Sequence, residues 1–261
     1  MQKLAFANNK GGVGKSSTAD QFAYYLNKMG KRVAVIELDH QLNSTKSLSL
    51  SPHVKVSTTT TTQIFLNGAT SFEPGNFVLF PGTRELKDLE KQGAAQHNVF
   101  ATNMAKFLDR IKDDFDVCII DTNGNPDIRV TIALVLSDFV LSPIQLNQEA
   151  IDGIGDLIGD IKKIKRLNPK LHLIGLLPNM VQASPFQKAN FDQIAKNYAH
   201  LLIMTAPDSN DFCHIPMRSV IPEAQAAGVP LWEIKKTAAR DAWRELEPYF
   251  KVIANRIGME L

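Results

Sequence analysis

The sequence has little cysteine, almost no net charge and no long apolar run, and each absence excludes a class of protein. Its 261 residues include two cysteines, Cys118 and Cys213, too few and too far apart for a disulfide framework or a CxxC metal site. The formal net charge of +2 excludes a histone-like polycation, so any contact with nucleic acid depends on a local basic patch. No stretch approaches the roughly 18 consecutive apolar residues of a membrane span.

The sequence also lacks the marks of targeting and of a multi-domain chain. One short apolar run at the N-terminus leads directly into a glycine loop, which leaves no room for the apolar region and cleavage site of a signal peptide. There is no internal repeat and no long linker, and the threonine-rich run 57–62 is short, either a loop or a β-prone edge. We therefore expect a single domain over residues 1–261, in the cytoplasm, with reduced thiols.

Short apolar runs alternate with helical patterns along the chain. The runs are apolar on both faces, which is typical of strands buried in a parallel sheet between helices. Two stripes, at 154–167 and 239–257, repeat apolar residues at helical spacing, and Pro248 predicts a kink or a helix start in the second. The alternation predicts an α/β fold, a doubly wound, mostly parallel sheet flanked by helices. The expected strands are Leu4–Ala7, Val33–Leu38, Phe77–Phe80, Val117–Ile120, Phe139–Leu141, Leu173–Leu177 and, as a late candidate, Leu201–Met204, with a helix over Ser16–Met29.

The segment Asn9–Ser17 carries the most specific chemical signal. It follows an expected strand and opens an expected helix, which is the context of a phosphate-binding loop. Glycines let the backbone approach phosphate and point its N–H groups at the oxygens, and the helix start adds a positive dipole end. Lys15 is the expected partner of the β- and γ-phosphates, and the Ser16 hydroxyl the expected ligand of Mg²⁺. The expected nucleotide contacts are Gly11, Gly12, Val13, Gly14, Lys15, Ser16 and Ser17.

The loop departs from the general phosphate-loop pattern. Asn9 stands where the pattern has glycine, and a second lysine, Lys10, lies inside the loop. This xKGGxGK[ST] form resembles the deviant Walker A motif of the ParA/MinD family of P-loop ATPases. The resemblance implies that Lys10 binds the partner's nucleotide in a sandwich dimer, as a cation supplied in trans to the transferred phosphoryl group. A solvated loop lysine is the alternative.

Carboxylates follow two of the expected strands. Glu37–Thr45 is similar to the family's DxDPQxNxT segment, and the resemblance implies that Asp39, at the second acid, helps to orient the attacking water. Glu37 replaces the usual first aspartate, as a strand residue or a water-mediated contact to Mg²⁺, and His40 replaces the usual proline. Asp121 ends a run that resembles a Walker B strand, and we expect it to hold Mg²⁺ through water. A Thr-Asn-Gly sequence then replaces the family's usual Pro-Pro pair, which leaves the local geometry open.

The expected reaction is phosphoryl transfer from ATP to water, with Lys10, Lys15 and Asp39 as catalytic residues and with ATP and Mg²⁺ as cofactors. No strong general base is visible, so we expect a weak Mg-dependent ATPase. ATP is favoured over GTP because Gln182 takes the place of the acid in an Asn-Lys-x-Asp guanine reader. The resemblance places Asn179 near adenine, and a turn residue at the strand end is the equal alternative.

The resemblance to the ParA family covers most of the chain, with weaker matches in VLFPGTRELKDLE, LSDFVLSPIQLNQEAIDGI and VIPEAQAAGVPLWE. No winged-helix extension precedes the loop, as in the small ParA class, which does not itself read operator DNA. The resemblance implies an ATP-dependent homodimer that binds double-stranded DNA without sequence preference and associates with the nucleoid. It further implies reset by a ParB-like partner that stimulates hydrolysis, and a role in partitioning plasmid or chromosomal DNA.

Nonspecific DNA binding requires basic side chains that contact phosphates. For any single basic residue a solvated helix face is the alternative, and DNA binding is implied by the resemblance more than by these charges. The candidates are Lys188, Arg218, Lys235 and Lys236, together with Lys162, Lys163, Lys165, Arg166 and Arg240.

Two other functions compete with DNA partition. A MinD-like membrane-cycling ATPase requires a C-terminal helix with an apolar and a basic face, but the polar positions after residue 239 mix basic with acidic residues. We therefore expect no membrane binding. A nitrogenase-iron-protein-like enzyme requires cluster cysteines at a dimer face, whereas Cys118 lies within an apolar strand run.

Overall fold

A sheet of seven parallel strands forms the centre of the computed structural model, which describes residues 1–206, 209 and 211–259. The strand order is β3-β4-β2-β5-β1-β6-β7, and every pairing between neighbours is parallel. The predicted doubly wound α/β sheet is therefore confirmed. The strands are β1 (Gln2–Phe6), β2 (Val33–Glu37), β3 (Lys55–Val56), β4 (Phe77–Phe80), β5 (Val117–Asp121), β6 (Phe139–Gln145) and β7 (His172–Asn179).

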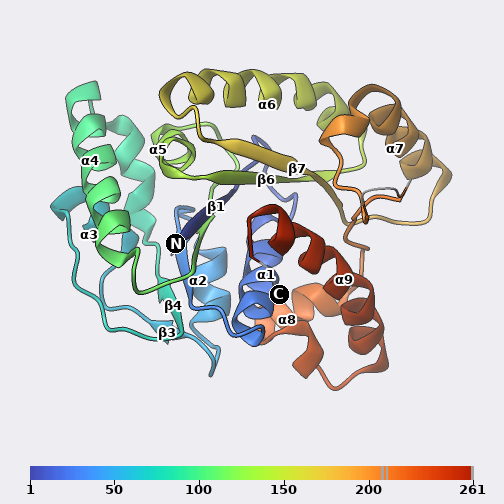
Figure 1. The fold of residues 1–261 in the computed structure, drawn as a ribbon, viewed down its shortest axis with the longest axis horizontal. Helices are drawn as coiled ribbons and strands as arrows, with labels where there is room; N and C mark the ends of the chain where they lie inside the picture. The colour runs from blue at the N-terminus through green and yellow to red at the C-terminus, as the bar shows by residue number, and fades with distance from the viewer. Residues whose placement is uncertain (207–208, 210, 260–261) are drawn as a thin grey trace.

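Helices cover both faces of the sheet (Figure 1). One face carries α3 (Thr61–Asn67), α4 (Ala94–Ile111), α5 (Ile128–Leu136), α6 (Gln148–Leu167) and α7 (Pro185–Tyr198). The other carries α1 (Lys15–Lys28), α2 (Asn43–Leu48), α8 (Val220–Ala227) and α9 (Thr237–Arg256). Short 3-10 turns are η1 (Arg84–Lys91), η2 (Ala199–Leu201) and η3 (Leu231–Glu233). No helix in the described part of the chain combines the length and apolar character that crossing a membrane requires.

Alternate residues of the central strands feed two separate cores. In β2, Ala34 and Ile36 pack on the side of α3 to α7, while Val33 and Val35 pack on the side of α1 and α9. All four side chains are fully buried. Because both faces of the strand are covered, its sequence is a continuous apolar run instead of an apolar–polar alternation.

The apolar stripe of α9 packs against α1 through aromatic rings. The ring centroid of Phe250 lies 5.4 Å from that of Phe22 and 5.8 Å from that of Tyr25, and Trp243 lies 5.9 Å from Tyr25. α9 begins at Thr237 and runs through Pro248, so Pro248 does not start this helix. The stripe is therefore internal packing.

Two expectations from the sequence were wrong. Leu201–Met204 is not a strand of the sheet, because the turn η2 ends at Leu201 and only isolated bridges follow, from Leu202 to Leu176 and from Met204 to Phe212. The threonine-rich run is only partly a loop. Thr60 caps α3, which begins at Thr61, and a reciprocal capping box with Gln63 fixes that helix start.

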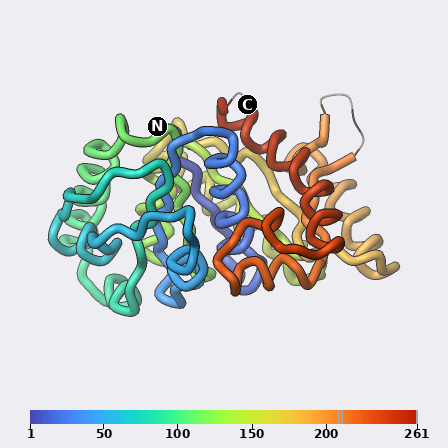
Figure 2. Tube along the Cα trace, turned by 90° about the horizontal axis from the view of Figure 1, so that it is seen from below, coloured from blue at the N-terminus to red at the C-terminus, as the bar shows by residue number. Residues whose placement is uncertain are grey.

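The two described ends of the chain lie at the same side of the molecule (Figure 2), and the parallel strands begin at the edge where β1 begins. β1 begins at Gln2, and Arg256 at the end of α9 donates a hydrogen bond of 2.7 Å to the Ile174 carbonyl near the start of β7. The opposite edge, where the strands end, consists of loops. Ligands of open parallel sheets bind at that edge.

We expect Phe250→Ala to lower the free energy of unfolding by about 3–5 kcal/mol, because deleting a fully buried ring leaves a cavity. Denaturant unfolding followed by circular dichroism measures the change. Tyr249→Ala, at a partly exposed neighbour on the same helix, is the matched control and is expected to cost clearly less. Equal losses for both variants would contradict the central place of Phe250 in this core.

Candidate functional site

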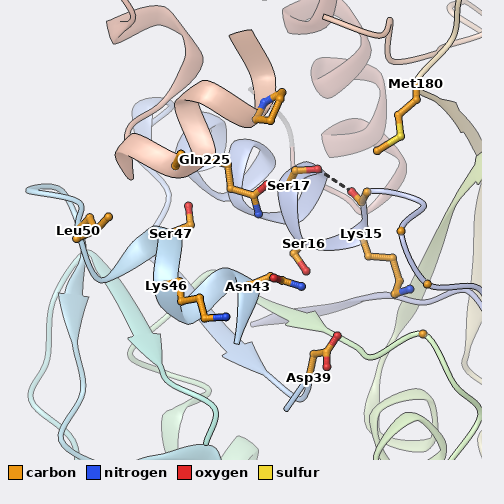
Figure 3. A pocket seen from close by; sticks show the side chains of 16 residues that line it. Lys15, Ser16, Ser17, Asp39, Asn43, Lys46, Ser47, Leu50, Met180 and Gln225 are labelled. Carbon is orange, nitrogen blue, oxygen red and sulfur yellow. Dashed lines mark hydrogen bonds between the residues drawn. The ribbon is translucent and has the colours of Figure 1, made fainter. Parts of the chain in front are cut away.

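The loops after β1, β2 and β5 meet at the carboxyl edge, next to the point where the strand order reverses. They border a cavity of about 510 Å³, within the usual range of ligand pockets. Figure 3 shows Lys15, Ser16 and Asp39 around this cavity. Of the predicted residues, the lining contains Gly11, Gly12, Gly14, Lys15, Ser16, Ser17 and Asp39; the rest of the lining includes Asn43, Lys46, Ser47 and Leu50 from the α2 region, Gly124, Met180, and Pro222, Gln225 and Ala226 from α8.

The phosphate loop turns sharply into α1. Gly12 and Gly14 have φ values of 72° and 83°, in the left-handed region that glycine adopts without steric cost. The Ser17 and Thr18 hydroxyls donate to the Gly14 carbonyl at 3.1 and 2.7 Å. Because α1 begins at Lys15, the positive end of its dipole faces the cavity, which favours an anion there.

Lys15 is a buried cation. Its Nζ donates to the carbonyl oxygens of Lys10 at 2.8 Å and Asn8 at 3.4 Å. Burial lowers the pKa of Lys15, whereas the nearby carboxylates of Asp121 and Asp39 raise it. The Lys15 ammonium therefore lies near two acidic groups, of which Asp39 lines the cavity and Asp121 is buried behind it.

Asp121 lies fully buried at the end of β5. Its Oδ2 lies 3.0 Å from the Ser44 hydroxyl, but its Oδ1 has no hydrogen-bond partner among the described residues. Burial raises the pKa of Asp121 to about 6, although the Ser16 and Ser44 hydroxyls and Lys15 lower it. A carboxylate oxygen left without a partner, together with the hydroxyl of Ser16, fits Mg²⁺, which takes oxygen ligands.

The segment after β2 is fixed by the carboxylates at its start. The Oδ1 of Asp39 accepts a hydrogen bond of 2.9 Å from the Gln41 amide, and the residue is almost buried. The Glu37 carboxylate accepts the backbone N–H groups of Ser44 at 2.9 Å and Thr45 at 2.8 Å. Burial raises the pKa of Glu37 to about 8. Glu37 is thus a strand residue that also holds the N-terminus of α2.

The Thr-Asn-Gly sequence after Asp121 packs directly on the phosphate loop. A Cβ added at Gly124 would lie 2.7 Å from the Gly11 Cα and 2.8 Å from its backbone nitrogen. Asn123 donates to Asp127 Oδ2 at 2.8 Å, and Asp127 caps α5. Only glycine fits between these two backbones, which gives this unusual sequence a defined structural role.

Arg129 is a buried residue behind the site that the sequence did not reveal. Its guanidinium is almost fully buried, forms an ion pair with Asp127, and donates to the Leu38 carbonyl at 3.0 Å. It also lies 3.4 Å from His40 Nδ1. Arg129 therefore ties the loop after β2 to the start of α5. Its only sequence signal is a charge among the apolar residues of α5.

Lys10 lies apart from the cavity that Lys15 lines. Its side chain lies over the start of α6, where its Nζ is 3.4 Å from Glu149 Oε2. The Lys10 side chain is 43% exposed and that of Glu149 81% exposed, so the pair contributes little to stability. Within one chain, the two lysines of the loop therefore have separate surroundings.

Asn179 holds the phosphate loop. Its side-chain amide donates to the Val13 carbonyl at 2.8 Å, and its Oδ1 accepts the Met180 N–H at 2.8 Å. Both predicted residues, Asn179 and Val13, thus lie against the cavity wall outside its lining. The contact of Asn179 with a base stays a prediction.

The basic candidates do not form one group. Lys162, Lys163, Lys165 and Arg166 lie on α6 and Lys188 on α7, whereas Arg218 precedes α8, Lys235 and Lys236 precede α9, and Arg240 lies on α9. Lys188 and His214 line a second cavity, of about 530 Å³, and Glu245 contacts both His214 at 3.7 Å and Arg218 at 3.2 Å. Lys236 pairs with Glu223 at 2.7 Å and Lys163 with Asp160 at 2.9 Å, so three of the candidates already have a carboxylate partner.

We expect Gly124→Ala to weaken ATP binding by at least about tenfold, since the added Cβ forces two backbones apart beside the phosphate loop. Titration with a fluorescent ATP analogue measures the dissociation constant. Gly155→Ala is the matched control, because a Cβ there meets no atom within 4 Å. Unchanged binding in Gly124→Ala would show that the close approach has no bearing on the nucleotide.

Solved structures show the same architecture. The protein is similar to an ATP complex of McdA from Cyanothece, with a TM-score of 0.80 and 18% identity, covering 100% of this chain and 98% of that chain. At this identity the likeness concerns the fold alone. It bears out the predicted P-loop fold.

Sequence comparisons identify the family. A family model described as an AAA domain matches residues 1–173. Protein IncC of Escherichia coli is 31% identical over 255 residues, covering 94% of this chain and 67% of that protein. The chromosome-partitioning ATPase Soj of Thermus thermophilus is 30% identical over 184 residues, covering 69% of this chain and 70% of that protein. With its phosphate loop of the deviant Walker A type, the chain belongs to the ParA family of P-loop ATPases.

Proposed function

We propose that the protein partitions plasmid or chromosomal DNA by a nucleotide cycle. In this cycle it binds ATP with Mg²⁺, dimerises, binds double-stranded DNA without sequence preference, and is reset by slow hydrolysis that a ParB-like partner stimulates. The observation that carries the proposal is the exposed Lys10 side chain, held outside the cavity by one weak ion pair. A loop lysine in that position is available to a second copy of the chain.

The residues around the cavity supply the parts of a phosphoryl-transfer site. Lys15 and the start of α1 bind the phosphates, and Ser16 and Asp121 hold the metal. Bound Mg²⁺ supplies charge neutralisation on the phosphate oxygens. Asp39 orients the attacking water from the opposite wall. No residue there is a strong general base, so positioning and charge supply the catalysis and turnover is slow.

The DNA surface that we propose lies over α7, α8 and α9. Arg218 and Lys236 are held by Glu245 and Glu223 in partly exposed pairs, which are worth at most about 1 kcal/mol each. DNA phosphates therefore compete for these cations at small cost. Because α8 also lines the nucleotide cavity, this surface is continuous with the site that binds ATP.

The packing of α9 disfavours the MinD-like alternative. Membrane binding by an amphipathic helix requires a free apolar face. In α9 the apolar residues Trp243, Leu246, Phe250 and Ile253 are buried, with rings against α1. This helix therefore has no apolar face to offer to lipid.

We expect the protein to bind unrelated duplex DNA with ATP and not with ADP, and to ignore anionic liposomes in both states. High salt is expected to abolish DNA binding, because phosphate contacts release counterions. A mobility-shift assay measures DNA binding and liposome sedimentation measures lipid binding, with Lys15→Ala as the nucleotide-free control. Binding to liposomes without binding to DNA would overturn the proposal and favour the membrane-cycling alternative.

We expect the combination of Lys235→Ala with Arg240→Ala to weaken binding to all DNA sequences equally. The slope of log binding constant against log salt concentration should fall by about one per lost contact.

We expect Lys10→Ala to retain ATP binding within about threefold but to lose ATP-dependent dimerisation. A cation supplied in trans is worth roughly 10³-fold in turnover, so partner-stimulated hydrolysis should fall to that extent. Light scattering after size exclusion measures the dimer. Lys91→Ala, at an exposed lysine paired with Asp88, is the matched control. If Lys10→Ala still dimerises with ATP, Lys10 is only a solvated loop lysine and takes no part in the dimer.

A further inference from the structure

Three acidic side chains lie close together under the first turn of α2. Asp121 and Glu37 have roles in the nucleotide site, but the third has none. Asp121 ends β5, Glu37 ends β2, and Asp20 comes from the second turn of α1. All three are 0% exposed. Asp20 is the unexplained member, because a charged residue is rarely buried without a partner of opposite charge.

Ser44 joins two of these acids. Its hydroxyl lies 2.6 Å from Asp20 Oδ1 and 3.0 Å from Asp121 Oδ2. A serine hydroxyl has one proton, so it donates to one carboxylate only. Both contacts are hydrogen bonds only if the other carboxyl group carries a proton and donates to the serine oxygen.

The contacts of this group do not depend on which acid carries that proton. Oδ2 of Asp20 and Oδ1 of Asp121 each have no hydrogen-bond partner within the described chain. In either arrangement, Ser44 Oγ is the hydrogen-bond partner that the two side chains share.

We propose that Asp20, Ser44 and Asp121 form a relay of hydrogen bonds, in which Asp20 anchors the Ser44 hydroxyl, and Ser44 positions the Asp121 carboxylate for Mg²⁺ and holds α2 against the nucleotide cavity. Asp20 and Ser44 are positioning residues in this proposal, since neither lines the cavity. The relay links α1, α2 and β5, and α2 is also held by its backbone bonds to Glu37. Asp121 keeps its Oδ1 free for the metal. The inference rests on the proposed binding of Mg²⁺ and ATP.

The test compares binding of a fluorescent ATP analogue in MgCl₂ and in EDTA. We expect Ser44→Ala to weaken binding about tenfold in MgCl₂ and to leave it within about twofold in EDTA, because partners that orient a metal ligand are worth roughly 10–100-fold in affinity. Ser49→Ala, at an exposed serine directly after α2, is the matched control and is expected to change neither value. A Ser44→Ala protein that binds like the wild type in MgCl₂ would overturn the proposal.

A double variant separates positioning from stability. Asp20→Val combined with Ser44→Ala replaces the buried polar pair by apolar groups, a change that is often neutral for stability. We expect thermal unfolding close to that of the wild type but the same tenfold loss of binding in MgCl₂. If this variant binds the analogue in MgCl₂ as tightly as the wild type, Asp20 and Ser44 serve only in packing and the proposal is wrong. If the wild-type protein itself does not bind the analogue, the proposed function fails and not the relay alone.

Discussion

The structure depends on a buried carboxylate at the end of a central strand. Asp121 has no contact with solvent, so the fold must compensate its charge from within. Lys15 provides the opposite charge, Ser44 provides a hydrogen bond, and one oxygen remains without a partner among the residues that the structure describes. The phosphate loop, α2 and β5 are held together by this one requirement. The cation and phosphate that we propose to bind here would complete a site that the protein alone leaves partly unsatisfied.

The position of α2 connects the nucleotide cavity with the basic residues beside α8. α2 forms one wall of the cavity, and its end packs against the end of α8, where a Cβ added at Gly228 would lie 2.5 Å from the Ser47 carbonyl. α8 in turn carries Glu223, the partner of Lys236. These two backbones are therefore in direct contact. In the nucleotide cycle that we propose, a shift of α2 is expected to reach α8 and, through Glu223, Lys236 at the start of α9.

Sequence alone was sufficient for the fold and for the phosphate-loop side of the cavity, because those signals are local. The strand before Asn9 and the helix after Gly14 fix the phosphate loop, and the register that places Asp121 beside Glu37 follows from two apolar runs ending in acids. The contacts of Gly124 and Ser44 were not predictable. Each joins segments far apart in the chain, and nothing in a neighbouring residue marks it. Only the packed structure shows that Gly124 touches Gly11.

The ion pairs of the protein fall into two kinds, buried pairs that fix the structure and exposed pairs that break at little cost. The pair of Arg129 with Asp127 is buried and also satisfied by the Leu38 carbonyl, so breaking it costs several kcal/mol and it fixes the loop after β2. The pairs of Lys10, Arg218 and Lys236 are exposed to water and weak. The nucleotide cycle that we propose needs this division, because it exchanges both a partner chain and DNA. The geometry around Asp121 is held by buried groups, while the cations that we propose for contacts with other molecules are released at little cost.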